Sequence, residues 1–68
     1  REMLKSSEVE LAQAEINYQR DADVVQRHRE LLQTRVTSQD EFEGYEARMK
    51  VSAKRVEAAQ AGVAESAG

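Results

Sequence analysis

Large hydrophobic residues recur every seven positions in both halves of the chain. In the first half they are Leu4, Leu11, Tyr18, Val25 and Leu32. In the second half they are Phe42, Met49, Val56 and Val63. Each row is accompanied, three positions later, by a second row of mostly smaller or polar residues. A sevenfold spacing sustained over several turns predicts two helices that pack along a coiled-coil seam, the row of facing positions between them.

The two rows match each other if the chain folds back on itself. In an antiparallel arrangement, partners whose numbers sum to 73 or 74 face each other. The predicted layers are Leu32 with Phe42, Val25 with Met49, His28 with Tyr45, and Asp21 with Ser52. Large residues then meet large ones along the first row. We therefore expect an all-α fold, a two-helix antiparallel coiled-coil hairpin.

The reversal is expected near Val36. We predict a first helix over about 2–34, a turn at about 35–37 that forms the tip, and a second helix over about 38–64. Ser38 and Glu41 have the spacing of a capping box, in which the serine hydroxyl accepts from the Glu41 N–H and the glutamate reaches back to the Ser38 N–H. Acidic residues follow in the first turns of the second helix, where the helix dipole favours anions.

Composition limits the class of function. Ten basic and 13 acidic residues give the 68-residue chain a net charge of −3, and no basic stripe is present, which argues against nucleic-acid binding. Apolar runs are too short to enter a membrane. There is no Cys, no phosphate-binding glycine loop and no strand–turn–helix context for a catalytic triad. We expect no enzymatic activity, no metal and no cofactor.

The chain also begins within a helical pattern, without a capping residue. Arg1 precedes a heptad that is already under way. We therefore expect this hairpin to be a fragment of a larger protein.

Three residues around the turn stand at fixed spacing. Arg27, Leu31 and Ser38 occupy relative positions 0, +4 and +11, within the longer pattern Arg-x-x-x-Leu-Leu-x-Thr-x-x-x-Ser-x-x-Glu-Phe. This pattern resembles the tip of the α-helical hairpin in periplasmic adaptor proteins, the membrane fusion proteins of tripartite efflux and secretion pumps. The resemblance covers nearly the whole chain.

The resemblance implies a transport role. In such adaptors the matching tip residues bind the periplasmic end of a TolC-like outer-membrane channel and help to hold it open. The parent protein would then lie in the periplasm, anchored to the inner membrane, and would contact an inner-membrane transporter through segments outside this chain. Full-length adaptors of this kind would assemble with one another.

Each tip residue also has a purely structural interpretation. Arg27 fits an exposed cation paired with Asp23, and Leu31 fits a widened apolar stripe rather than an exposed anchor. Ser38 is first of all a helix N-cap, worth about 1 kcal/mol. Docking of a partner is the alternative for all three.

Further residues are candidates for support of the tip or for lateral packing. Val24 repeats the side position of Leu31 one heptad earlier, and His28 is expected to pack beside Tyr45. Gly44 is either tolerated in the second helix or leaves room for a neighbouring helix. Val9 and Ile16, seven apart on the outer face, are either ordinary surface residues or the place where a neighbouring hairpin packs.

Two other functions remain open. A generic structural coiled-coil arm of a scaffold or chaperone explains the heptads equally well, but not the tip spacing. A tRNA-binding arm of a synthetase-like enzyme is a more distant alternative, because the chain is acidic.

Overall fold

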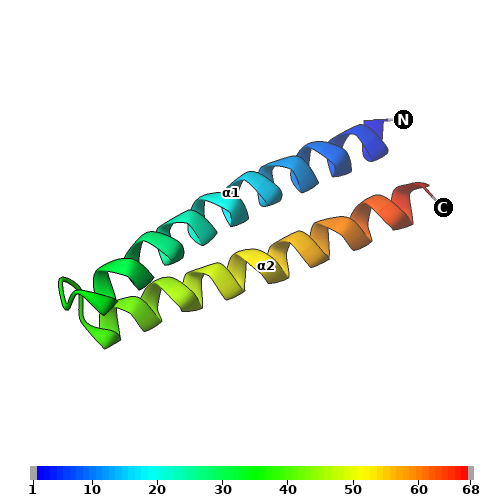
Figure 1. Cartoon of the computed structure of the whole chain (residues 1–68). Coiled ribbons are helices and arrows are strands. Elements are labelled where there is room, and N and C mark those ends of the chain that lie inside the picture. Colours follow the sequence, from blue (N-terminus) through cyan, green and yellow to red (C-terminus); the bar gives the residue numbers. More distant parts are fainter. Residues whose placement is uncertain (1, 68) are drawn as a thin grey trace.

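The chain folds as a hairpin of two long helices. The computed structural model describes the backbone of residues 2–67 and the side chains of residues 5–65. Helix α1 (Glu2–Gln33) and helix α2 (Gln39–Ala67) lie side by side and antiparallel, with both termini at the end opposite the connecting loop (Figure 1). The result is a rod of 50 × 13 × 11 Å. The predicted all-α antiparallel hairpin is confirmed.

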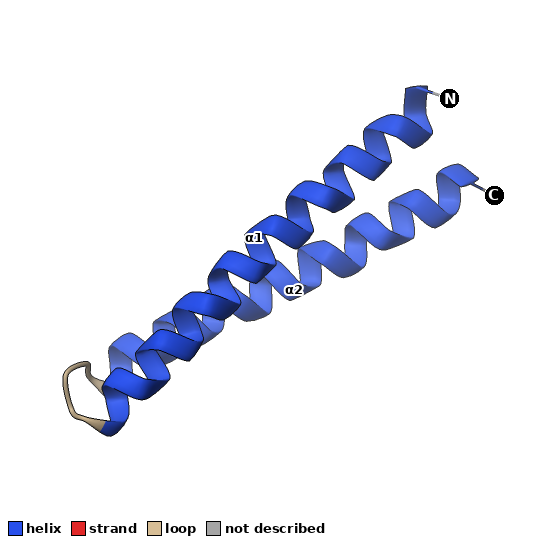
Figure 2. Cartoon of the chain, turned by 45° about the horizontal axis from the view of Figure 1, so that its top comes forward, coloured by secondary structure: helices blue, strands red, loops and turns tan. Residues whose placement is uncertain are grey.

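Loop 34–38 is the only non-helical segment of residues 2–67 (Figure 2). Helix α1 ends at Gln33, close to the expected boundary. Helix α2 runs on to Ala67, so the predicted end near 64 was too early. The extra residues are Glu65, Ser66 and Ala67, and no Pro or Gly lies among them to stop the helix.

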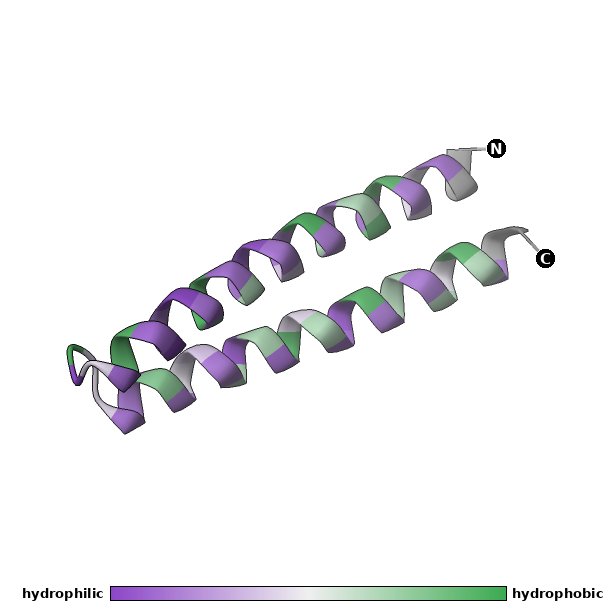
Figure 3. Cartoon of the chain, in the orientation of Figure 1, coloured by the Kyte–Doolittle hydropathy of each residue, from purple (hydrophilic) through white to green (hydrophobic). Residues whose placement is uncertain are grey.

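The buried core is small because each helix can be covered on one side only. Val25 and Phe42 are the buried hydrophobic side chains among residues 5–65, with 2% and 6% of their surface exposed. The other described seam hydrophobics are half-buried; they are Leu11, Tyr18, Leu32, Met49, Val56 and Val63. Hydrophobic bands recur along both helices between larger hydrophilic stretches (Figure 3). The side chains of Leu4 and Ser66 lie outside the described residues.

Two polar contacts establish the pairing of the helices. The Ser52 hydroxyl donates a hydrogen bond to Asp21 Oδ2 across the seam. The rings of His28 and Tyr45 stack with centroids 4.0 Å apart. The residue numbers sum to 73 in both pairs, so the predicted register is confirmed at these two layers. Over the described residues, neither helix has a stretch that combines the length and apolarity needed to cross a bilayer.

Candidate functional site

The end of α1 is closed by a Schellman motif. The Arg35 N–H donates to the Leu32 carbonyl at 3.0 Å, and the Val36 N–H donates to the Leu31 carbonyl at 2.9 Å. Arg35 has a φ of 63°, the left-handed conformation that this motif requires and that glycine normally supplies. A residue with a side chain is disfavoured there by roughly 1–2 kcal/mol.

The start of α2 is capped by Ser38. Its Oγ accepts a hydrogen bond from the Glu41 N–H at 3.1 Å, as predicted. The second predicted bond of the capping box, from the Ser38 N–H to the Glu41 carboxylate, is wrong. The Glu41 carboxylate accepts instead from the hydroxyl of Thr37, at 2.7 Å, because Thr37 is buried and its hydroxyl needs a partner. The two bonds hold loop 34–38 against the first turn of α2.

The chain reversal brings Leu31 and Ser38 to the same end of the rod. We call residues 27–42 the tip region. Leu31 lies in the last turn of α1, and its carbonyl also accepts from the Thr34 hydroxyl at 3.0 Å. Arg27 lies one turn earlier on the same helix face. Arg27 and Ser38 are exposed, whereas Leu31 is half-buried. The loop that joins the two helices lies at the end of the rod opposite both termini (Figure 1).

Arg27 does not form the ion pair expected from its spacing. The Oδ1 of Asp23 accepts a hydrogen bond from Gln19 Nε2 at 3.0 Å instead. Among residues 5–65 the single ion pair within 4.0 Å is Lys54 with Glu57, at 3.4 Å. The guanidinium of Arg27 is therefore open to solvent, with its donors available.

His28 connects the two helices behind the tip. Its Nδ1 lies 2.9 Å from the carbonyl oxygen of Val24. A carbonyl can only accept, so Nδ1 carries the hydrogen. The imidazole then stacks on Tyr45 at an interplanar angle of 34°. Val24, like Leu31, is half-buried on the flank. The predicted packing of His28 beside Tyr45 is confirmed.

Two arginines extend this aromatic contact. The guanidinium of Arg29 lies 5.8 Å from the centre of the Phe42 ring, and that of Arg48 lies 5.6 Å from the centre of the Tyr45 ring. Both distances suit cation–π interactions. The Arg29–Phe42 contact joins α1 to α2, whereas the Arg48–Tyr45 contact lies within α2.

Gly44 occupies open space within the chain. A methyl group added at its Cα would meet nothing within 4 Å. No part of the described chain therefore needs a glycine at this position. Gly44 is exposed, so the open space beside it lies on the surface of the hairpin.

The predicted lateral pair is exposed. Val9 and Ile16 have 58% and 67% of their surface exposed on the outer side of α1. They border a shallow hollow of about 450 Å³ that Ala12, Gln13, Asn17 and Arg20 also line. Arg20 donates to the Asn17 side chain at 2.6 Å within it.

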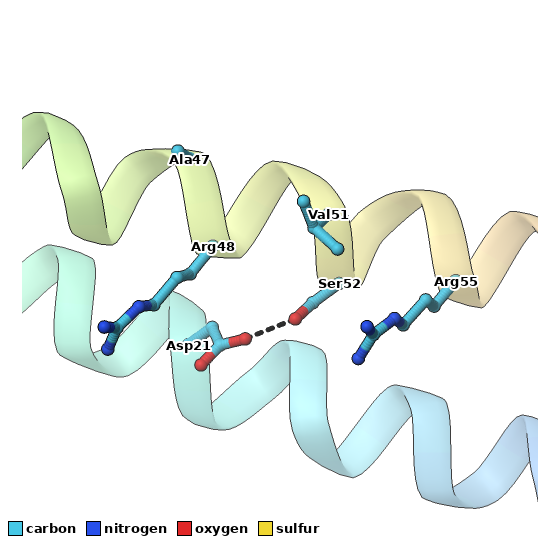
Figure 4. A pocket seen from close by; sticks show the side chains of 6 residues that line it. All are labelled: Asp21, Ala47, Arg48, Val51, Ser52 and Arg55. Atoms are coloured by element: carbon cyan, nitrogen blue, oxygen red, sulfur yellow. Dashed lines mark hydrogen bonds between the residues drawn. The ribbon is translucent and has the colours of Figure 1, made fainter.

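Two features of the described chain were not predicted from the sequence. The first is Val36 in the loop, the most exposed large hydrophobic residue of the described chain, at 70%. The second is an open groove of about 390 Å³ beside the seam, lined by Asp21, Ala47, Arg48, Val51, Ser52 and Arg55 (Figure 4). There Arg48 and Arg55 extend on either side of Asp21. The sevenfold spacing of the two arginines was the available signal for the groove.

Metal-binding geometry is absent from the described residues, where no three His, Cys, Asp or Glu side chains cluster. Comparison with protein-family models, with curated protein sequences and with solved structures finds no match to this chain.

Proposed function

We propose that this hairpin is a docking arm that binds the periplasmic end of a TolC-like outer-membrane channel. The observation that carries the proposal is the placement of the Arg27, Leu31 and Ser38 pattern at one extremity of a 50 Å rod. In periplasmic adaptors, which this pattern resembles, the tip of the hairpin is the docking element. The proposal gives the chain no catalytic role and no cofactor.

The chemistry of the tip region supports binding to helix ends. Arg27 has five N–H donors, and none of them is bonded to the described residues. Carbonyl and carboxylate oxygens at the ends of channel helices would accept from them. Leu31 is half-buried and offers a small apolar contact beside this cation.

Binding of this kind would act on the channel by differential affinity. A tip that binds the open channel more tightly than the closed one shifts the channel toward the open state. One small contact is weak, so several arms in a ring would supply the avidity. Val9 and Ile16 are proposed as the surface through which neighbouring arms pack in such a ring.

This assignment places the parent protein in the periplasm, anchored to the inner membrane. Its contact with the inner-membrane transporter would involve segments outside this chain. The generic coiled-coil arm of a scaffold or chaperone is the alternative, and it gives no role to the unpaired Arg27.

The test is a binding measurement with a purified TolC-like channel in detergent. The chain is immobilised at high density through its C-terminal end, so that several tips can engage one channel. We expect Arg27→Asp and Leu31→Ser each to weaken binding by about tenfold or more. Arg55→Asp and Val51→Ser, the same changes at mid-hairpin, should bind like the wild type.

Circular dichroism shows whether each variant keeps its helices. Folded Arg27→Asp and Leu31→Ser variants that bind as well as the wild type would rule out docking through this tip. In a cell, the same two changes in the parent protein should abolish export.

A further inference from the structure

Val36 projects from the tip region although its backbone is held on both sides. Its N–H is bonded to the Leu31 carbonyl at 2.9 Å. The next residue, Thr37, is buried and bonded to Glu41 at 2.7 Å. A Schellman motif usually covers the residue at this position by contact with the one that corresponds to Leu31. Here Val36 keeps 70% of its surface exposed.

Arg35, its neighbour, has a conformation that favours glycine. At a φ of 63° the side chain is disfavoured, whereas glycine would be accommodated without steric cost. The guanidinium is exposed and has no bonded partner among residues 5–65. Fold stability therefore favours neither the arginine at 35 nor the exposed valine at 36. Strain retained at a surface position is an indication of function.

We infer that Arg35 and Val36 make the leading contact with the partner and determine which partner the tip accepts. This inference rests on the proposed docking function. Val36 would enter a shallow apolar recess, and Arg35 would donate to carboxylate or carbonyl oxygens at the rim of that recess. Because the loop backbone is already fixed, binding loses little conformational entropy.

The charges around the loop favour a protein partner over a lipid surface. Asp40, Glu41 and Glu43 lie in the first turns of α2, directly after the loop. With Glu30 they outnumber the cations Arg27, Arg29 and Arg35, so the tip region lacks the basic cluster that binds anionic headgroups. A single valine also buries too little apolar surface to hold the rod on a bilayer. In a protein partner, the oxygens of the recess can be placed next to Arg35 and away from the acidic side chains of α2, so that repulsion is avoided.

The experiment exploits opposite expected effects on folding and on binding. Arg35→Gly should raise the midpoint of thermal unfolding, followed by circular dichroism, and should weaken binding to the purified channel by about tenfold. Arg35→Asn should also weaken binding, since asparagine tolerates this conformation but lacks the fork of donors. Val36→Ser should leave the midpoint nearly unchanged and reduce affinity similarly. Val51→Ser is the matched control and should alter neither.

Several outcomes would overturn the inference. Arg35→Gly and Val36→Ser binding like the wild type, while Arg27→Asp binds poorly, would refute the inference and leave the proposed docking function standing. A wild-type chain that binds no TolC-like channel would remove both. Binding to anionic phospholipid vesicles that is lost in Val36→Ser would replace the protein partner with a membrane.

Discussion

Ser52 donates its hydroxyl hydrogen to the carboxylate of Asp21 across the seam, at a layer where a coiled coil normally places apolar side chains. Ser52 is 5% exposed and Asp21 is half-buried, so each side chain satisfies the other. A polar pair of this kind discriminates between registers. A helix shifted by one heptad would place Tyr45 or Ala59, rather than Ser52, opposite the carboxylate.

Removal of the hydroxyl should therefore destabilise the hairpin. We expect Ser52→Ala to lower the free energy of unfolding by about 1–2 kcal/mol, measured by urea denaturation, because Asp21 loses its donor. Asp21→Ala combined with Ser52→Ala should lose less than the sum of the single changes. Ser6→Ala, at an exposed position of α1, is the control and should cost nothing. Strict additivity of the two seam changes would show that the hydrogen bond contributes no coupling.

The small core makes Val25 unusually important. Val25→Ala removes two buried methyl groups and leaves a gap against α2, so it should cost about 2 kcal/mol. The same substitution at Val51, which is half exposed, should change stability by less than about 0.5 kcal/mol. Equal effects at the two positions would mean that the seam does not bury Val25 in solution.

Ser38 can be tested separately as a cap and as a contact. Ser38→Ala removes the acceptor for the Glu41 N–H and should cost about 1 kcal/mol. Ser38→Asp keeps a capping oxygen and should preserve the thermal midpoint. If Ser38→Asp also keeps full affinity for the channel, the hydroxyl serves the helix alone. A loss of affinity in this folded variant would instead place Ser38 in the interface.

A substitution at Gly44 shows whether the glycine is merely tolerated in α2 or leaves room for a neighbouring helix. Since nothing lies within 4 Å of the added methyl group, Gly44→Ala should stabilise the chain by about 1 kcal/mol through helix propensity. A neighbouring helix that packs on this side would lose affinity in the same variant. Unchanged binding together with higher stability would show that the glycine is merely tolerated. Lower stability would contradict the open surroundings of Gly44.

The outer face of α1 yields a prediction about self-association. Val9→Glu together with Ile16→Glu should weaken self-association in analytical ultracentrifugation without loss of helicity, because both side chains are already exposed. Gln26→Glu with Gln33→Glu adds the same charge at the same spacing on α1 and should leave assembly unchanged. Assembly that is insensitive to the first pair would exclude this face.

The sequence alone predicted much of the tip region, but only where the signal is local. The cap at Ser38 was recognisable because a serine three residues before a glutamate interacts with its own helix. The end of α1 was less predictable, since no glycine marks the left-handed position and Arg35 carries no sign of that conformation. The Glu41 carboxylate binds the Thr37 hydroxyl rather than the Ser38 N–H because Thr37 is buried, and the sequence did not reveal that burial. Likewise, Asp23 accepts a hydrogen bond from Gln19 and not from Arg27, although both lie four residues away, a choice that spacing alone does not reveal.

By itself, the sequence determined the two helices, their antiparallel register and the residues that meet at the seam, because heptad spacing repeats along the chain and large residues must be covered by large ones. Only the tertiary structure decided which side chains remain uncovered when the chain reverses. The groove between Arg48 and Arg55 forms where α1 and α2 meet, whereas the exposure of Val36 and the left-handed conformation of Arg35 arise in the loop that reverses the chain. Those positions are set by three-dimensional packing, which the periodicity of either helix does not encode.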